Sequence, residues 1–463
     1  MAQLSLPLVA LALIALFSFL VGLSRQSRSS RTQARPSLGK IDIKKQDGAH
    51  KSQGFPSQDG EAGRTPTSTS WPDVEPLTDF DWTSTPPAIF RPFKPVFNIT
   101  MAIQASTPSN LITIDRNYLD RVTSRRRLIA AHGPAVVGVL PTARAVQAVR
   151  DLYAYLLGFY LPRRFPSMFE LTPGQIPEPH EFSSSSPTSP SSDLREKLEK
   201  KDRTRVFFHN KITHRQSPLN PPPSDPLEML RILGETVEDD LFLVLRDGSD
   251  SDPAACDGGG DGGSRGQQQQ HRAVAFVCCH PAGFDPSEKL GKRLVDIHAP
   301  VPGYEKIQAS MERFFGRLEV GRPVRRVNWG IQTHPNLYAP ASHAPPQASS
   351  AVSGASSDED DSNNTNFDMH ETHLRVELQT LTRLPRSTTT TSNSESGHDR
   401  SDKGPILFSF KTHLYPLTAL RAEGHGPDLA DAIEGLRYGN APAMWEYKGA
   451  ERWGRGVCEF LRS

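Results

Sequence analysis

The chain has 463 residues, and its 53 Lys and Arg against 52 Asp and Glu leave a formal net charge of +1 at pH 7. A balanced charge gives no broad positive field, so we expect no nucleic-acid partner. The 4 cysteines form no CxxC pair, which argues against a disulfide framework, a zinc finger or an iron–sulfur cluster. Low-complexity sequence takes up so much of the length that we expect one large ordered domain of roughly 270 residues.

The N-terminus carries an uncharged run from Leu4 to Leu23, long enough to cross a hydrocarbon core of about 30 Å as a helix. No basic residue precedes this run, and four arginines follow it: Arg25, Arg28, Arg31 and Arg35. The positive-inside rule then predicts a single-pass anchor in membrane lipid, with the domain in the cytosol. We expect the endoplasmic reticulum as the membrane. The alternative is a cleaved signal peptide, which would have a basic start and an evident small-residue cleavage site.

Residues 24–85 are rich in Ser, Thr, Gln, Pro and charge and show no apolar period, so we expect a disordered stalk. We assign residues 86–463 to the domain. Four low-complexity inserts interrupt it, near residues 172–200, 247–271, 340–368 and 386–403. Long structureless stretches within a domain are typical of disordered insertions.

Between the inserts, the apolar pattern predicts both helices and strands. Helices are expected at 145–157, 226–233 and 304–318 and from Pro427 onward. Short β-rich runs are expected to form strands at 241–245, 273–277, 324–331, 374–381 and 406–410. Three inserts fall between consecutive strands, which suits surface connections of an antiparallel sheet. The predicted fold class is therefore α+β, a mainly antiparallel sheet with flanking helices. The short basic run Arg125–Arg127 is interpreted as a solvated helix face.

His298 is the first candidate metal ligand. It lies in Ile297-His-Ala-Pro-Val-Pro-Gly, where two prolines fix the backbone beyond it. A metal centre that takes only one ligand from the protein needs no His or Cys cluster. From the residues alone, a buried histidine bonded to the backbone is the better interpretation. His334 is a second candidate at an expected strand end, and Cys458 ranks below His298.

Two predicted strands carry polar side chains that could bind a ligand. Arg326 and Asn328 share one face of the first strand, and Trp329 lies on the other. Arg375, Glu377 and Gln379 share one face of the second. Asn328 could hydrogen-bond an amine or oxygen, and Glu377 could bind a cationic amine. The alternative is an ordinary pair of strands with a solvated polar face.

Six stretches, taken in order, resemble the haem-dependent oxidative N-demethylase family, whose fungal branch is called the HRQ family. The likeness spans residues 88–445 outside the inserts. It departs from the family pattern at Glu377-Leu378-Gln379, where bacterial members tend to have Glu-Arg-Gln. The six stretches are Ile99-Thr-Met-Ala; Leu161-Pro-Arg-Arg-Phe-Pro; Pro281-Ala-Gly-Phe-Asp-Pro with Ile297-His-Ala-Pro-Val-Pro-Gly; Arg326-Val-Asn-Trp; Leu374-Arg-Val-Glu-Leu-Gln-Thr-Leu-Thr-Arg-Leu-Pro; and Ile406-Leu-Phe-Ser-Phe-Lys-Thr.

The resemblance implies a PAS-like sheet that binds a b-type haem (heme b), with His298 as axial ligand. It also implies a monooxygenase-type oxidoreductase that uses dioxygen to N-demethylate a small amine, with Glu377 and Asn328 as the catalytic residues. Because no flavin or nicotinamide fingerprint is present, the external electron donor would be a separate reductase.

The resemblance further suggests that Trp329 packs on the haem. Arg326, Arg375 or Arg383 would hold a haem propionate in place of the missing arginine. The alternatives are a haem-binding PAS-like sensor and a non-catalytic scaffold that retains the fold.

Overall fold

The computed structural model describes residues 71–91, 93–174, 205–247, 270–340, 368–386 and 404–463. All of them belong to one compact unit, Pro66–Ser463. The predicted anchor at residues 4–23, most of the predicted stalk and almost all of the four inserts lie outside the described residues.

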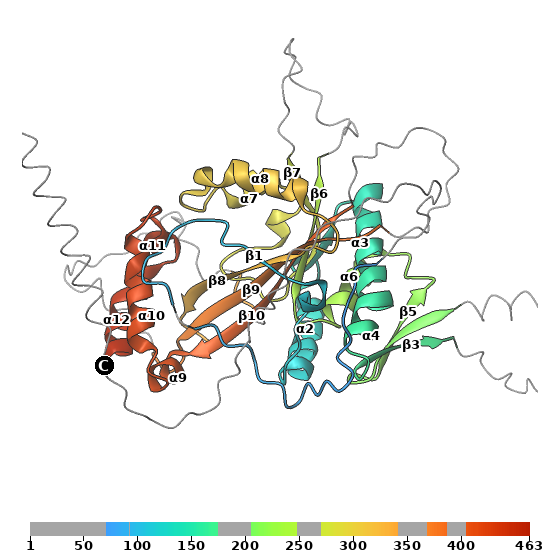
Figure 1. Ribbon diagram of the computed structural model, residues 1–463, viewed down its shortest axis with the longest axis horizontal. Helices are drawn as coiled ribbons and strands as arrows, with labels where there is room; N and C mark the ends of the chain where they lie inside the picture. Colours follow the sequence, from blue (N-terminus) through green and yellow to red (C-terminus); the bar gives the residue numbers. More distant parts are fainter. Residues whose placement is uncertain (1–70, 92, 175–204, 248–269, 341–367, 387–403) are drawn as a thin grey trace, which may run out of the picture. The chain divides into compact units, whose positions relative to one another are not determined.

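A seven-stranded sheet forms the centre of this unit, with the strand order β1-β8-β9-β10-β6-β7-β2 and antiparallel pairing throughout (Figure 1). Five of these strands were predicted, and the expected mixed α+β class with a mainly antiparallel sheet is confirmed. The strands are β1 (Gln104–Ala105), β2 (Val137–Val139), β6 (Asp240–Arg246), β7 (His271–Val277), β8 (Val324–Gln332), β9 (His373–Arg383) and β10 (Ile406–Pro416).

Helices α2 (Tyr118–His132), α3 (Ala143–Tyr155) and α6 (Pro226–Gly234) pack on the first face of the sheet, which carries Leu243 and Leu407. Thr142 caps α3 by accepting a hydrogen bond from the Ala145 amide, and Asp225 caps α6 in the same way at Leu227. A π-helical turn, Leu156–Tyr160, joins α3 to α4 (Leu161–Arg164). A second sheet contains β3 (Phe169–Pro173), β4 (Val206–Asn210) and β5 (Arg215–Asn220).

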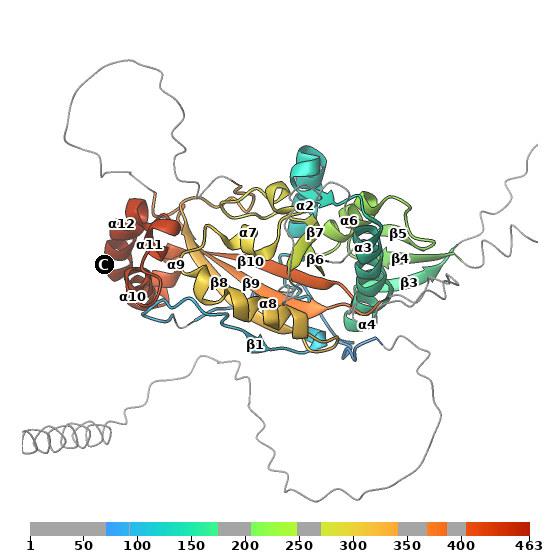
Figure 2. The same ribbon diagram turned by 90° about the horizontal axis from the view of Figure 1, so that it is seen from above.

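Helices from the C-terminal half cover the rest of the sheet. On the second face, α7 (Leu294–His298) and α8 (Gln308–Arg317) pack against Val244, Leu381 and Ile406. Figures 1 and 2 show these two helices lying together beside the sheet. Four helices cluster on Ile331 and Val376 of the first face. They are α9 (Leu417–Ala422), α10 (Gly426–Glu434), α11 (Met444–Tyr447) and α12 (Ala450–Arg462).

The structure differs from the predicted stalk at residues 71–85. Val74 is fully buried, and the Trp71 ring stacks on Tyr155 with centroids 5.4 Å apart. The Leu77 amide also donates to the Arg164 carbonyl at 2.8 Å. These contacts join the segment to the core. Its sequence lacks an apolar period because it packs as an extended chain rather than as a helix or strand.

The expected single-pass membrane topology is corrected. Within the ranges given above, no helix is both long and apolar enough to cross a membrane. The apolar run at residues 4–23 lies outside the described residues and gives the expectation no structural support. The predicted endoplasmic reticulum location is therefore withdrawn.

Arg125 corrects the interpretation of the basic run as a solvated helix face. Its side chain is fully buried, and its guanidinium contacts the Asp240 carboxylate at 2.6 Å. It also donates to the Gly234 carbonyl at 2.8 Å. Arg127, two positions later, is exposed as expected. Arg125 therefore holds α2 to the start of β6.

We predict that Arg125→Met lowers the free energy of unfolding by about 3–5 kcal/mol, because it leaves the Asp240 carboxylate buried without its partner. Arg127→Met is the matched control on the same helix and should change stability by less than about 0.5 kcal/mol. Urea unfolding of the full chain measures both. Equal stability of the two variants would contradict the assigned role of Arg125.

Candidate active site

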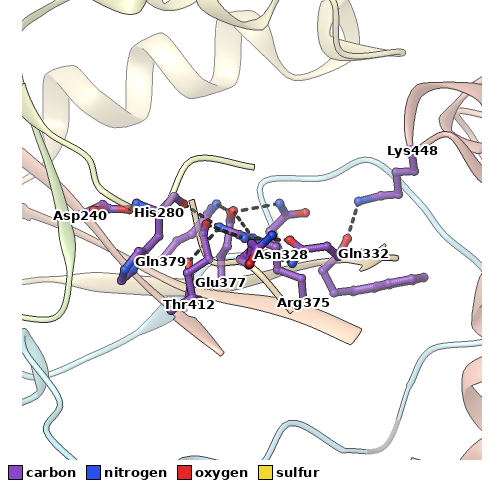
Figure 3. A network of polar contacts seen from close by, with 12 residues as sticks. Asp240, His280, Asn328, Gln332, Arg375, Glu377, Gln379, Thr412 and Lys448 are labelled. Atoms are coloured by element: carbon purple, nitrogen blue, oxygen red, sulfur yellow. Dashed lines mark hydrogen bonds and ion pairs between the residues drawn. The ribbon is translucent and has the colours of Figure 1, made fainter. Parts of the chain in front are cut away.

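A row of polar side chains crosses the second face of the sheet on β8, β9 and β10 (Figure 3). Strand pairing places Asn328 opposite Glu377, and Glu377 opposite Thr412. Arg326 lies opposite Gln379 in the same register. The predicted alternation is therefore correct: Arg326, Asn328 and Glu377 share a face, because directly paired residues point to the same side of a sheet.

Glu377 is the centre of this row and is only 8% exposed. Its Oε2 atom accepts hydrogen bonds from Gln379 Nε2 at 2.9 Å and from Asn328 Nδ2 at 3.2 Å. Its Oε1 atom lies 4.0 Å from Arg375 Nε. Two amides thus hold Oε2, while Oε1 has only the longer Arg375 contact among the described residues. A buried carboxylate held in this way is suited to bind a cation.

Arg375 holds the neighbouring segments around Glu377. One terminal nitrogen donates to Gln332 Oε1 at 2.9 Å and to the Leu337 carbonyl at 3.2 Å. The other donates to the His280 carbonyl at 2.6 Å and lies 3.4 Å from Thr412 Oγ1. These bonds leave little of the guanidinium for a haem propionate.

His298 ends α7, and its Nδ1 atom lies 2.8 Å from the Leu294 carbonyl oxygen. A carbonyl can only accept, so Nδ1 carries the proton and the lone pair of the neutral ring is on Nε2. The Tyr304 ring stacks on the imidazole with centroids 4.9 Å apart. Burial lowers the pKa of His298, and the charge of Arg326 adds to this shift. A neutral imidazole with a free Nε2 is the form that binds a metal.

The two other candidate ligands are arranged differently. His334 Nδ1 accepts a hydrogen bond from the Asn336 amide at 3.2 Å, which puts the proton of the neutral ring on Nε2. Cys458 is buried in α12, and burial raises the pKa of its thiol to about 11. Neither presents the lone pair or thiolate that a haem iron binds, so the geometry favours His298.

The three candidate propionate ligands differ in their partners. Arg383 donates to the carbonyls of Leu318, Gly404 and Phe315 at 2.6–2.7 Å and so holds the end of α8 to β9. Arg326 is half-buried, and its Nε atom has no hydrogen-bond partner among the described residues. Burial lowers the pKa of Arg326, while the nearby Glu377 carboxylate opposes that shift. Arg326 is therefore the cation best placed to receive an anionic group.

Leu378, where the family pattern has arginine, points to the first face of the sheet, opposite Lys411 on β10. An arginine at this position would point away from the Glu377 face. The departure therefore leaves the polar row itself unchanged.

Sequence reasoning missed Lys448, which follows α11. Its Nζ donates to the Trp329 carbonyl and lies 5.4 Å from the centre of the Trp329 ring. Burial lowers the pKa of Lys448 to about 8, and the Glu377 carboxylate opposes this shift. Trp329 itself faces the C-terminal helices rather than the polar row, so its predicted haem contact stays untested. No local pattern links Lys448 to β8, because more than a hundred residues separate them.

An aromatic cluster continues the second face beyond the polar row. Phe242, Phe276 and Phe410 pack together, with Phe242 and Phe276 stacked at 5.6 Å. Phe284, from the predicted Pro281-Ala-Gly-Phe-Asp-Pro stretch, packs on them. A polar row beside an apolar, aromatic surface is typical of sites for small ligands.

Two of the other quoted stretches also meet in space. The Asn440 side chain accepts a hydrogen bond from the Ile99 amide at 2.7 Å and donates one to the Ile99 carbonyl at 3.1 Å. Gly303 has a φ of 77°, and a Cβ there would lie 3.0 Å from Ile99 Cγ2. The Ile99 stretch therefore packs directly against the loop that follows His298.

We predict that stability rises with pH through Lys448. The unfolded lysine titrates near ~10.4, so between pH 8 and about 10 the unfolded state binds more protons than the folded state. Raising the pH over this interval therefore increases the contribution of Lys448 to the free energy of unfolding. Lys448→Met should remove that rise, as measured by urea midpoints at pH 7.5 and 9.5. An unchanged pH dependence would mean that Lys448 is solvated and titrates normally.

The chain matches one known family over most of its length. A family model described as haem-dependent oxidative N-demethylase, alpha subunit-like, matches residues 102–393 and 401–458, which is more than two thirds of the chain. The matched ranges include every residue of the polar row and His298. The chain belongs to the haem-dependent oxidative N-demethylase alpha subunit-like family.

Proposed function

We propose that this chain is a haem-dependent oxidoreductase of the monooxygenase type that removes an N-methyl group from a small amine. The observation that carries the proposal is a combination at one face of the sheet: a neutral histidine whose Nε2 has the lone pair, an arginine whose Nε has no partner among the described residues, and a buried carboxylate. We also interpret the antiparallel sheet and its helices as PAS-like, as the family resemblance implies.

The residues present fit a haem. His298 Nε2 would be the axial ligand, and Arg326, with its unpartnered Nε, would pair with a propionate. The Phe242–Phe410 aromatic cluster would pack on the apolar part of the macrocycle and exclude water. When bound, the haem would supply the binding and activation of dioxygen.

The Glu377 carboxylate would bind the substrate ammonium through Oε1, while Asn328 and Gln379 keep Oε2 in place. Fixing the amine nitrogen would hold one of its methyl groups at a defined position, and such positioning accounts for much of enzymatic rate enhancement.

Electrons would come from a separate reductase, since oxygen insertion needs two electrons that these side chains cannot supply. The words "alpha subunit-like" in the family description are compatible with an electron donor on another chain.

We predict that the full chain binds about one haem and shows a Soret band that His298→Ala removes or shifts. His334→Ala is the matched control and should leave the band unchanged, because its proton lies on Nε2. Absorption spectra of the oxidised and reduced protein measure this. A well-folded protein that stays colourless after haem supplementation would contradict both the oxidase and the haem-sensor interpretations.

We predict that Glu377→Gln retains the haem but raises KM for a methylated amine by about 10- to 100-fold, equivalent to about 1.5–3 kcal/mol for a charged hydrogen bond. Glu371→Gln, on the exposed segment before β9, is the control and should leave KM unchanged. Steady-state amine oxidation with a chemical or enzymatic reductant measures both. Haem binding without amine turnover in the wild type would instead favour a sensor.

A further inference from the structure

The sheet has a gap beside the second half of β10. Strand β6 pairs with β10 only from Ile406 to Phe410, whereas β9 pairs with β10 as far as Pro416. Among the described residues, 411–416 therefore have no strand on the β6 side. Lys411, in this stretch, instead contacts Asp115, just before α2, and Glu238, just before β6.

Lys411 is the centre of the network on the first face. Its buried ammonium lies 2.8 Å from Asp115 Oδ2 and 2.8 Å from Glu238 Oε2, and it donates to the Thr113 carbonyl at 3.0 Å. Asp239 adjoins Glu238 and is 3% exposed. Lys411 thus lies among several carboxyl groups, with Arg121 and Arg125 close to the same groups.

Hydrogen bonds, and at the end one ion-pair contact, lead from this cluster to the candidate active site. Arg125 contacts the Glu238 carbonyl at 3.3 Å and the Asp240 carboxylate at 2.6 Å. Asp240 accepts from the His280 amide at 2.9 Å, and the His280 carbonyl accepts from Arg375 at 2.6 Å. Arg375 Nε then points toward Glu377, at 4.0 Å (Figure 3). The network therefore passes from one face of the sheet to the other.

Unpartnered polar atoms concentrate along this network. In the part of the chain that the structure describes, fourteen buried side-chain nitrogen and oxygen atoms have no hydrogen-bond partner, and seven of them belong here. Both donors and acceptors are present, so bridging waters could satisfy them, as internal waters do in other proteins. The seven atoms are Arg121 NH1, Arg125 NH2, Glu238 Oε1, Asp239 Oδ2, His280 Nε2, Arg375 Nε and His413 Nε2.

One of these side chains, Asp239, can hold a proton near neutral pH. Burial raises the pKa of Asp239 to about 7, although Lys411 opposes the shift; Glu238, Asp240 and Arg125 are the other charges facing it. Burial also raises the pKa of Glu238. His280 stays neutral, because burial lowers its pKa. Its unpartnered Nε2 can therefore hydrogen-bond a bridging water without adding a charge.

We propose that this network is a hydrated proton path that connects the Glu238–Asp239 pair to the Glu377 side of the sheet. The inference rests on the proposed function. Insertion of one oxygen atom of dioxygen into a methyl C–H bond releases the other as water. Each turnover thus consumes two electrons, from the reductase, and two protons. The protons would enter near half-buried Arg121 and move through bridging waters and the Glu238 and Asp239 carboxyl groups, while His280 Nε2 and the arginines hydrogen-bond and orient these waters.

The first test uses the haem-free full chain. Infrared difference spectra between pH 6 and pH 8.5 should contain the carbonyl band of a protonated carboxyl group, present at the lower pH. Asp239→Asn should remove or shift this band, and the isosteric Glu238→Gln should perturb it. Asp247→Asn, at an exposed site after β6, is the control. A spectrum without the band in a folded wild-type chain would overturn the proposal.

The second test uses the haem-loaded chain with an amine and a reductase. Asp239→Asn should lower turnover at least tenfold and enlarge the solvent deuterium isotope effect, with an unchanged Soret band and amine KM. Glu238→Gln provides the same test if Asp239→Asn fails to fold. Wild-type turnover and isotope effect in both variants would overturn the path. A wild type that binds no haem would instead overturn the proposed function, and the infrared band would still report on the network.

Discussion

The Arg375 guanidinium determines how the rest of the site is arranged. It is 3% exposed, and its bonds join β9 to the end of β8, to the loop at Leu337, to His280 and to β10. Burying a guanidinium is costly unless its hydrogen bonds are satisfied. The segments around it are therefore held in one arrangement, which keeps Glu377 and its two amide donors at a fixed position on the second face. Loss of Arg375 would loosen both the polar row around Glu377 and the hydrogen-bond network that runs through His280 and Asp240.

Charge and packing separate the two faces of the sheet. The first face is mainly apolar where α3, α6 and the C-terminal helices cover it, but polar at Lys411. The second face combines an aromatic cluster with a row of polar groups, under a segment that carries His298 and Phe284. A ligand with an apolar body and charged edges matches that combination, and a haem together with a small ammonium is one such pair.

Alternation along β8 and β9 was enough to predict which side chains share a face, because the period of a strand is two. It put Arg326 with Asn328 and Arg375 with Glu377, as observed. The ordered set of short stretches was also enough to suggest the family that the comparison confirmed.

Contacts between segments far apart in the chain could not be predicted. The burial of Arg125, the three-stranded sheet, the packing of residues 71–85 and the approach of Lys448 to Trp329 all depend on tertiary pairing. The apolar run at residues 4–23 led us to predict a membrane location that has no structural support. Composition alone cannot show whether an apolar segment lies in a membrane.

The central claim is that one face of the sheet holds both the haem ligand and the carboxylate that binds the amine. The most direct test is to add a methylated amine to the haem-loaded full chain and follow the Soret band. The account predicts a saturable spectral shift in the wild type that disappears in Glu377→Gln while the haem stays bound. A shift of equal amplitude and affinity in Glu377→Gln would contradict this claim, because the amine would then bind near the haem without the Glu377 carboxylate.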